Sequence, residues 1–210
     1  MPRQNRVTPR GDMIAVPDRG TFWGNRGALH DAHQNLVRYA RGQAWIICLL
    51  EFKGRSRQLW APGRLTEVFF LDEATGLAAG HRPCGECRIA DYRRFKAAYH
   101  AGHPDRPTSA PDMDAHLHAD RLLSPRIKRT YRARLAGLPD GTMIERGDRP
   151  WLVLGPDLLA WTHAGYHETV ARDAIEVVTV LTPRATVATV RAGYQPVLHP
   201  SATAHRATKG

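Results

Sequence analysis

The sequence predicts an α+β protein, because strand signals and helix signals occur in separate stretches of one chain. Its 210 residues suffice for one large domain or two small ones, and 42% hydrophobic with 8% aromatic residues is ordinary for a globular protein. Residues 45–52 form a nearly continuous apolar run rich in β-formers, which is typical of a buried strand. Residues 89–99 repeat apolar side chains at helical spacing. We therefore expect a small sheet with short helices, followed by further helices and a small β-rich part.

The first part of the chain is expected to cover residues 1–100. Residues 1–30 are rich in Arg, Gly, Pro and Asn, which predicts a basic arm or loop layer with at most short strands. Asp72 then begins a short helix that Gly80 ends, and a second helix covers residues 89–99. Three strands precede these helices: residues 45–52, 57–60 and 66–71.

The second part is expected at residues 113–200, after a linker or mobile loop at 101–112. A helical zone with a basic face is predicted at 113–136, interrupted at Pro125 because proline cannot continue a helix interior. A loose tail is expected at 201–210. The remaining elements are four short strands, at 142–146, 150–154, 158–161 and 176–181, and a last helix at 182–193.

The positive charge is concentrated in two zones of a chain whose net charge is +10. Residues 1–64 contain 11 Lys and Arg against 4 Asp and Glu, and residues 113–137 contain 6 against 2. Such zones favour a polyanion, because each neutralised phosphate releases counterions. We therefore expect nucleic-acid binding, with an acidic protein as the alternative partner. The candidate contacts are Arg3, Arg6, Lys53, Arg55, Arg57, Arg82, Arg126, Lys128, Arg129 and Arg132.

The sequence favours a cytoplasmic protein with no membrane partner. No stretch approaches the roughly 20 apolar residues of a membrane helix, and the first residues lack the apolar core of a signal peptide. Three cysteines do not form a disulfide framework.

Two of those cysteines form a Cys-x-x-Cys knuckle, Cys84 to Cys87, whose thiolates have the spacing that zinc accepts. A closed structural zinc site needs two further ligands. The candidates are Cys48, on the preceding strand, and His81, just before the knuckle. Zinc is the expected cofactor, and a redox pair or simply packed thiols are the alternatives.

Residues 68–88 resemble the second half of the N-terminal metal-binding module of the Ada family of bacterial alkylation-response proteins. The resemblance is densest in the run Ala78-Ala79-Gly80-His81-Arg82-Pro83-Cys84-Gly85-Glu86-Cys87. In that family a strand and a short helix lead into the knuckle, four cysteines bind zinc, and the module contacts the DNA backbone and accepts methyl groups from phosphotriesters. The resemblance implies an Ada-like sheet with a zinc knuckle and a role in repair or damage recognition. It favours DNA over RNA as the partner, whereas the charge pattern alone implies only nucleic acid and leaves RNA open.

The sequence departs from the family at its first cysteine pair. An ungapped extension of the match places residues 53–57 there, and neither Lys53 nor Arg57 can become a zinc-activated thiolate. Methyl transfer by the family's route is therefore not expected.

Two arrangements would instead suit an enzyme acting on damaged or modified nucleic acid. Removal of Met1 would expose the secondary amine of Pro2, which could attack an abasic site as in bifunctional DNA glycosylases of the formamidopyrimidine type. Asp114 and His118 lie four residues apart in the predicted helix and could act as orienter and base, although a solvated helix face would look the same. Tryptophans could also stack on bases, although strand tryptophans are usually core: Trp23, Trp45, Trp60, Trp151 and Trp161.

Overall fold

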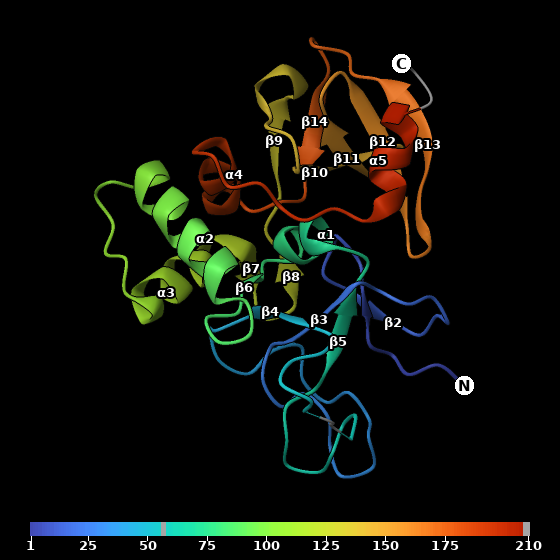
Figure 1. Cartoon of the computed structure of the whole chain (residues 1–210), viewed down its shortest axis with the longest axis vertical. Coiled ribbons are helices and arrows are strands. Elements are labelled where there is room, and N and C mark those ends of the chain that lie inside the picture. Colours follow the sequence, from blue (N-terminus) through green and yellow to red (C-terminus); the bar gives the residue numbers. More distant parts are fainter. Residues whose placement is uncertain (56–57, 208–210) are drawn as a thin grey trace.

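The computed structural model describes residues 1–55 and 58–207, which contain two six-stranded sheets, a two-stranded hairpin, five α-helices and a 3-10 helix at Leu135–Gly137, joined by loops (Figure 1). The α+β class is confirmed. In Figure 1 the first sheet lies below the second, α1 lies between them, and α2 and α3 form a lobe on one side. None of the helices in these residues is both long and apolar enough to cross a membrane.

The first sheet has the strand order β2-β1-β5-β3-β4-β6, and β3 is antiparallel to both β4 and β5. Its strands are β1 (Arg6–Val7), β2 (Met13–Ile14), β3 (Phe22–Asn25), β4 (Ile46–Leu49), β5 (Val68–Phe70) and β6 (Arg82–Pro83). The strands expected at 45–52 and 66–71 are therefore confirmed in their central residues. The strand expected at 57–60 is not formed in residues 58–60, because Trp60 takes a left-handed φ of 57° in a turn. Arg57 lies outside the described residues.

Local signals correctly predicted the two helices around the knuckle. Helix α1 (Glu73–Ala78) begins after Asp72, whose carboxylate accepts a 2.9 Å hydrogen bond from the backbone nitrogen of Thr75. Gly80, at φ 88°, ends it. Helix α2 (Ile89–Gly102) follows the knuckle.

Helix α3 (Ala110–Arg121) begins earlier than expected, because the Ser109 side chain caps it. Only residues 103–109 of the expected linker therefore lie outside a helix.

The basic helix expected at 113–136 is wrong beyond Arg121. The chain continues as β7 (Leu122–Ser124) and β8 (Ile127–Lys128), an antiparallel hairpin whose turn contains Pro125, and then as β9 (Tyr131–Arg134). Proline stops the helix, and β9 alternates half-buried and exposed residues as a strand covered on one face does. Arg126, Arg129 and Arg132 thus lie on or beside strands.

The second sheet is antiparallel, with the order β13-β12-β11-β10-β14-β9. Its remaining strands are β10 (Met143–Arg146), β11 (Arg149–Leu154), β12 (Asp157–Thr162), β13 (Gly165–Ala171) and β14 (Val177–Val180). The four expected strands and the last expected helix, α4 (Arg184–Arg191), are confirmed. Strand β13 was not expected.

The tail is not loose where it is described. Helix α5 (Pro200–Ala207) packs against β13, and the Ser201 hydroxyl accepts a 2.9 Å hydrogen bond from the Tyr166 nitrogen. The backbone before it is held by two buried carboxylates at the start of α1. Asp72 accepts hydrogen bonds from the Tyr166 hydroxyl and the His199 nitrogen, and Glu73 accepts them from the Tyr194 hydroxyl and the Val197 nitrogen.

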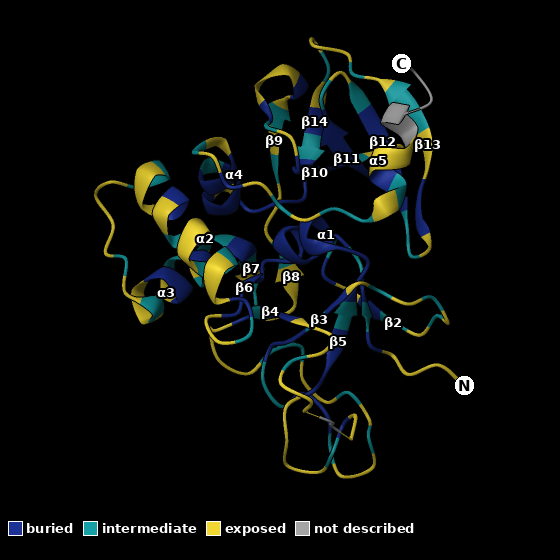
Figure 2. Cartoon of the chain, in the orientation of Figure 1, coloured by how far each residue is buried: buried dark blue, intermediate teal, exposed yellow. Residues whose placement is uncertain are grey.

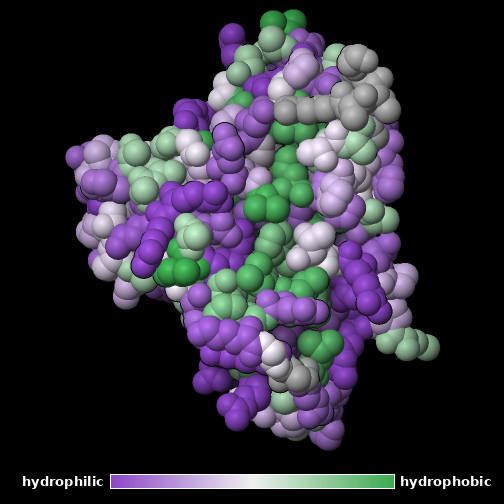
Figure 3. Space-filling view, in the orientation of Figure 1, coloured by the Kyte–Doolittle hydropathy of each residue, from purple (hydrophilic) through white to green (hydrophobic). Residues whose placement is uncertain are grey.

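Three clusters of apolar side chains form the core. One joins the first sheet to α2, α3 and α4, and includes Phe70, Phe95, Met113 and Val190. A second packs α1 against the second sheet, and the third lies between that sheet and α4. Figure 2 shows α1 buried throughout, whereas the lower loops and the outer side of α2 are exposed. Figure 3 shows that the same face of the molecule is largely hydrophilic, with hydrophobic residues gathered mainly in a central run.

Candidate metal centre and the pocket beside it

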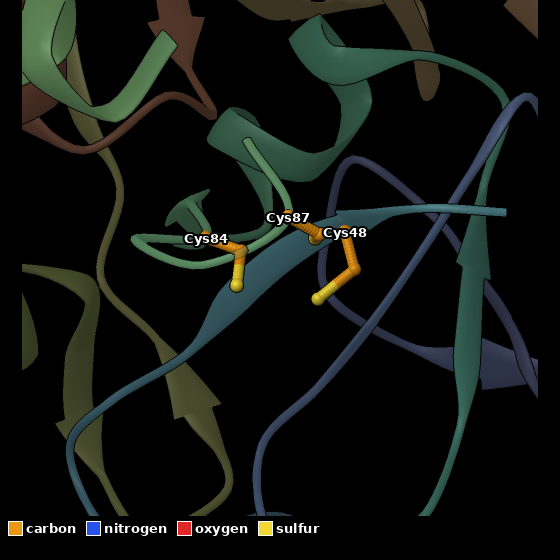
Figure 4. A group of neighbouring side chains, drawn as sticks. All are labelled: Cys48, Cys84 and Cys87. Atoms are coloured by element: carbon orange, nitrogen blue, oxygen red, sulfur yellow. The ribbon is translucent and has the colours of Figure 1, made fainter. Parts of the chain in front are cut away.

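The three cysteines of the chain come together at one edge of the first sheet (Figure 4). Cys48 lies on β4, and Cys84 and Cys87 lie on the loop after β6. Strands β4 and β6 are parallel, and the Cys84 nitrogen donates a 2.9 Å hydrogen bond to the Ile47 carbonyl. This pairing brings the three Sγ atoms within 4.8 Å of one another, so they could hold a metal ion.

The thiols interact strongly with one another. Hydrogen bonding from the Cys48 thiol is the main influence that lowers the pKa of Cys84 to about 5, and the Glu86 nitrogen also donates to its sulfur at 3.4 Å. Interaction with Cys84, followed by burial, raises the pKa of Cys48, and burial raises that of Cys87. One thiolate is thus stabilised by two protonated neighbours. Zinc fits this donor set, because it binds deprotonated cysteine sulfurs at about 2.3 Å.

His81 does not join the cluster, so the expectation that it is a metal ligand is wrong. It precedes Cys84 by three positions along extended backbone, and side chains an odd number apart point to opposite faces of a sheet. Its ring packs on the core side, with its centroid 4.7 Å from that of Phe70, and its Nε2 faces the Arg26 guanidinium at 3.2 Å. Among the described residues no fourth His, Cys, Asp or Glu completes the set.

A pocket of about 260 Å³ opens beside the cysteines, on the face of the first sheet that points away from the core. Its floor follows the strand register. Trp23 on β3 lies opposite both Cys48 on β4 and Phe69 on β5. Two residues further along β3, Asn25 lies opposite Ile46, and the same register brings it beside Glu67. The loop after β4 and the knuckle form the walls: Leu49, Leu50, Phe52, Arg55, Leu59, Leu65, Cys84, Glu86 and Cys87.

Several cations expected to contact nucleic acid are indeed on the surface: Arg3, Lys53, Arg55, Arg126, Arg129 and Arg132. Arg55 lines the pocket and forms a 2.7 Å ion pair with Glu86. Arg6 is only half-buried and lies over the Phe69 ring, with Cζ 4.9 Å from the ring centroid.

Arg82 was expected to contact nucleic acid, and this is wrong because its side chain is buried. Its Nε and one Nη donate to the two Asp114 carboxylate oxygens at 2.7 and 2.6 Å. Because Asp114 is paired with Arg82, it does not orient His118, and the expected dyad of Asp114 and His118 is not formed. The His118 Nδ1 lies 2.8 Å from Arg121 instead, and burial lowers its pKa.

Lys128 was also expected on the nucleic-acid surface, but its ammonium points inward and donates a hydrogen bond to the Ala78 carbonyl. Burial, followed by the nearby charge of Arg26, lowers its pKa to about 7. Arg26 and Arg121 are themselves buried against the Trp45 ring, with Cζ 4.5 and 3.9 Å from its centroid. Part of the net positive charge is therefore internal.

Pro2 is exposed and does not line the pocket. The floor residues Asn25, Glu67 and Phe69 were not recognised in the sequence. Residues two positions apart on a strand share a face, so the spacing of Glu67 and Phe69, and of Trp23 and Asn25, could have predicted that each pair lies on one face. The spacing could not have predicted that this face is open to a pocket.

No family model matches the chain, and neither the curated proteins nor the solved structures searched include a significant match.

Proposed function

We propose that this chain is a zinc-holding, nucleic-acid-binding protein, with DNA as the favoured partner and damage recognition or repair as its role. The observation that carries the proposal is the cluster of three cysteine sulfurs beside a pocket, in a chain of net charge +10. The resemblance of residues 68–88 to the Ada-type module supports it, because β5, α1 and the knuckle follow in that family's order.

Cys48, Cys84 and Cys87 would hold the zinc. A bound zinc would cross-link β4 to the loop after β6, and its binding free energy would contribute directly to folding. Cys48 lies opposite Trp23 on the neighbouring strand, so the metal would also fix one wall of the pocket.

The nucleic acid would be attracted by exposed cations on two parts of the surface. Lys53 and Arg55 lie on the loop that walls the pocket, and Arg126 and Arg129 lie at the β7–β8 hairpin. The ion pair between Arg55 and Glu86 is well exposed, so little free energy is lost when a phosphate replaces the carboxylate.

Elemental analysis of the purified protein tests the metal. We expect close to one zinc per chain, a lower melting temperature after chelation, and loss of zinc in Cys48→Ser and Cys84→Ser. The control is His33→Ala, which removes an exposed potential ligand outside the cluster and should keep its zinc. Metal-free protein whose melting temperature is unchanged by chelation would contradict the zinc assignment.

Fluorescence anisotropy with labelled duplex and single-stranded DNA, measured over a range of salt concentrations, tests the partner. Binding should weaken linearly on a log–log plot as salt rises. An acidic polypeptide serves as competitor. If the acidic polypeptide displaces the DNA completely at an equal concentration of negative charges, the basic surface binds an acidic protein rather than nucleic acid.

A further inference from the structure

We propose that the pocket beside the cysteines binds one unstacked nucleobase, with the ring against Trp23 and Phe69 and its polar edge at Asn25 and Glu67. The inference rests on the proposed nucleic-acid-binding function and names the part of the ligand that the pocket takes.

Aromatic side chains lie on the floor and wall of the pocket. Trp23 and Phe69 are cross-strand partners on the pocket face, both are half-buried, and Phe52 stands on the wall. Cations lie over one face of two of these rings: Arg6 over Phe69 at 4.9 Å, and Lys53 and Arg55 over Phe52 at 5.1 and 5.4 Å from the ring centroid. A base would stack on the opposite face of a ring or displace such a cation toward its phosphate. Every base has a flat π-face, so stacking on such side chains does not require a particular sequence. The pocket of about 260 Å³ has room for a single ring system rather than for a helix or strand.

The polar pair on the floor supplies a donor next to an acceptor. Asn25 is 4% exposed, its Oδ1 accepts a hydrogen bond from the Gly27 nitrogen at 3.2 Å, and its Nδ2 has no hydrogen-bond partner within residues 1–55 and 58–207. Glu67 is 6% exposed, and one carboxylate oxygen is held by the Trp60 nitrogen at 2.9 Å. A buried amide without a partner is costly, and a ring nitrogen or carbonyl of a base would satisfy it.

The rim of the pocket suits the rest of a nucleotide. Four leucines on it are at least partly exposed, with Leu50 at 51%, and would cover the sugar and the flanking base. Lys53 and Arg55 are exposed on the same loop, within the part of the chain that would meet the phosphates. The pocket therefore combines stacking, edge recognition and phosphate attraction.

The test uses zinc-loaded protein and two fluorescent probes. One is 2-aminopurine riboside, and the other is a single-stranded oligonucleotide with one 2-aminopurine, compared with the same strand carrying an abasic position there. We expect the riboside to bind with quenching and the abasic strand to bind less tightly. Trp23→Leu should weaken riboside binding at least about fivefold, the low end of what removing a stacking residue costs. Trp23→Phe, which keeps a ring, should restore part of it.

Leu123→Ala is the matched control, because Leu123 is an exposed apolar residue on β7 that does not line the pocket. Should the oligonucleotide bind while the riboside does not, and the abasic strand bind equally well, the base pocket is refuted and nucleic-acid binding stands. Binding of the riboside alone, sensitive to Trp23→Leu, supports the pocket and refutes the proposed function. Binding of neither probe refutes both.

Discussion

Removing the carboxylate of Asp114 should destabilise the protein strongly, because it leaves the buried guanidinium of Arg82 without a counter-ion. The two side chains are 7% and 8% exposed and are joined by two hydrogen bonds. Breaking a buried pair in this way costs about 3–5 kcal/mol. In a protein of this size about 1 kcal/mol corresponds to about 2–4 °C, so Asp114→Ala should lower the melting temperature by about 6–20 °C. Because Arg82 lies two residues before Cys84, the variant should also retain less zinc.

Thermal unfolding followed by circular dichroism measures this change. Asp105→Ala is the control, since Asp105 is an exposed carboxylate in the loop between α2 and α3. The double variant Arg82→Met with Asp114→Leu should recover most of the lost stability, because it removes both buried charges. A fall of less than about 2 °C in Asp114→Ala would refute the reasoning. If Asp114→Ala lost an enzymatic activity while its melting temperature stayed unchanged, Asp114 would be catalytic rather than structural.

Three further predictions concern the charges and the thiols. Arg126→Ala and Arg129→Ala should each weaken DNA binding similarly across sequences. Each should also reduce the steepness of the plot of log binding constant against log salt concentration by about 0.9 for duplex DNA. An unchanged slope would mean that the hairpin does not contact phosphate. In the folded protein, burial lowers the pKa of Lys128 to about 7. Between pH 7 and the ordinary lysine pKa the unfolded chain therefore binds more protons than the folded protein. The free energy of unfolding should consequently rise with pH in this range. Denaturation at pH 7 and pH 9 should show this rise in the wild type and lose it in Lys128→Met. Finally, mass spectrometry after incubation with methylated DNA should find no methyl group on Cys48, which is only 3% exposed. If the wild-type protein gained a methyl group and the variant Cys48→Ala did not, this prediction would be wrong.

Local patterns in the sequence determined much of the region around the site. The spacing from Cys84 to Cys87, the Asp72 cap and the apolar repeat of α2 each depend on residues within a few positions of one another, so the sequence alone predicted them. The strand signal around Cys48 was equally local, and Cys48, one of the two candidate further ligands, does lie beside the knuckle. Side-chain alternation could also have excluded His81, had β6 been recognised as a strand.

Tertiary structure decided which charges are available for binding. An arginine count cannot separate Arg82, paired with Asp114 across 32 positions, from Arg126 on the surface, because burial depends on contacts between distant segments. Strand β9 was missed for a related reason: arginines and a tyrosine at helical spacing fit a helix, but β9 is held by pairing with β14 more than 40 positions later.

The sequence by itself thus determined the class of the fold, the knuckle and the positive charge, all of which follow from composition or short-range spacing. Only the tertiary structure decided that Trp23 and Asn25 share an open face with Cys48, Glu67 and Phe69. That arrangement depends on the register of β3 against both of its neighbours, because a shift of β3 by one residue would have turned Trp23 and Asn25 into the core.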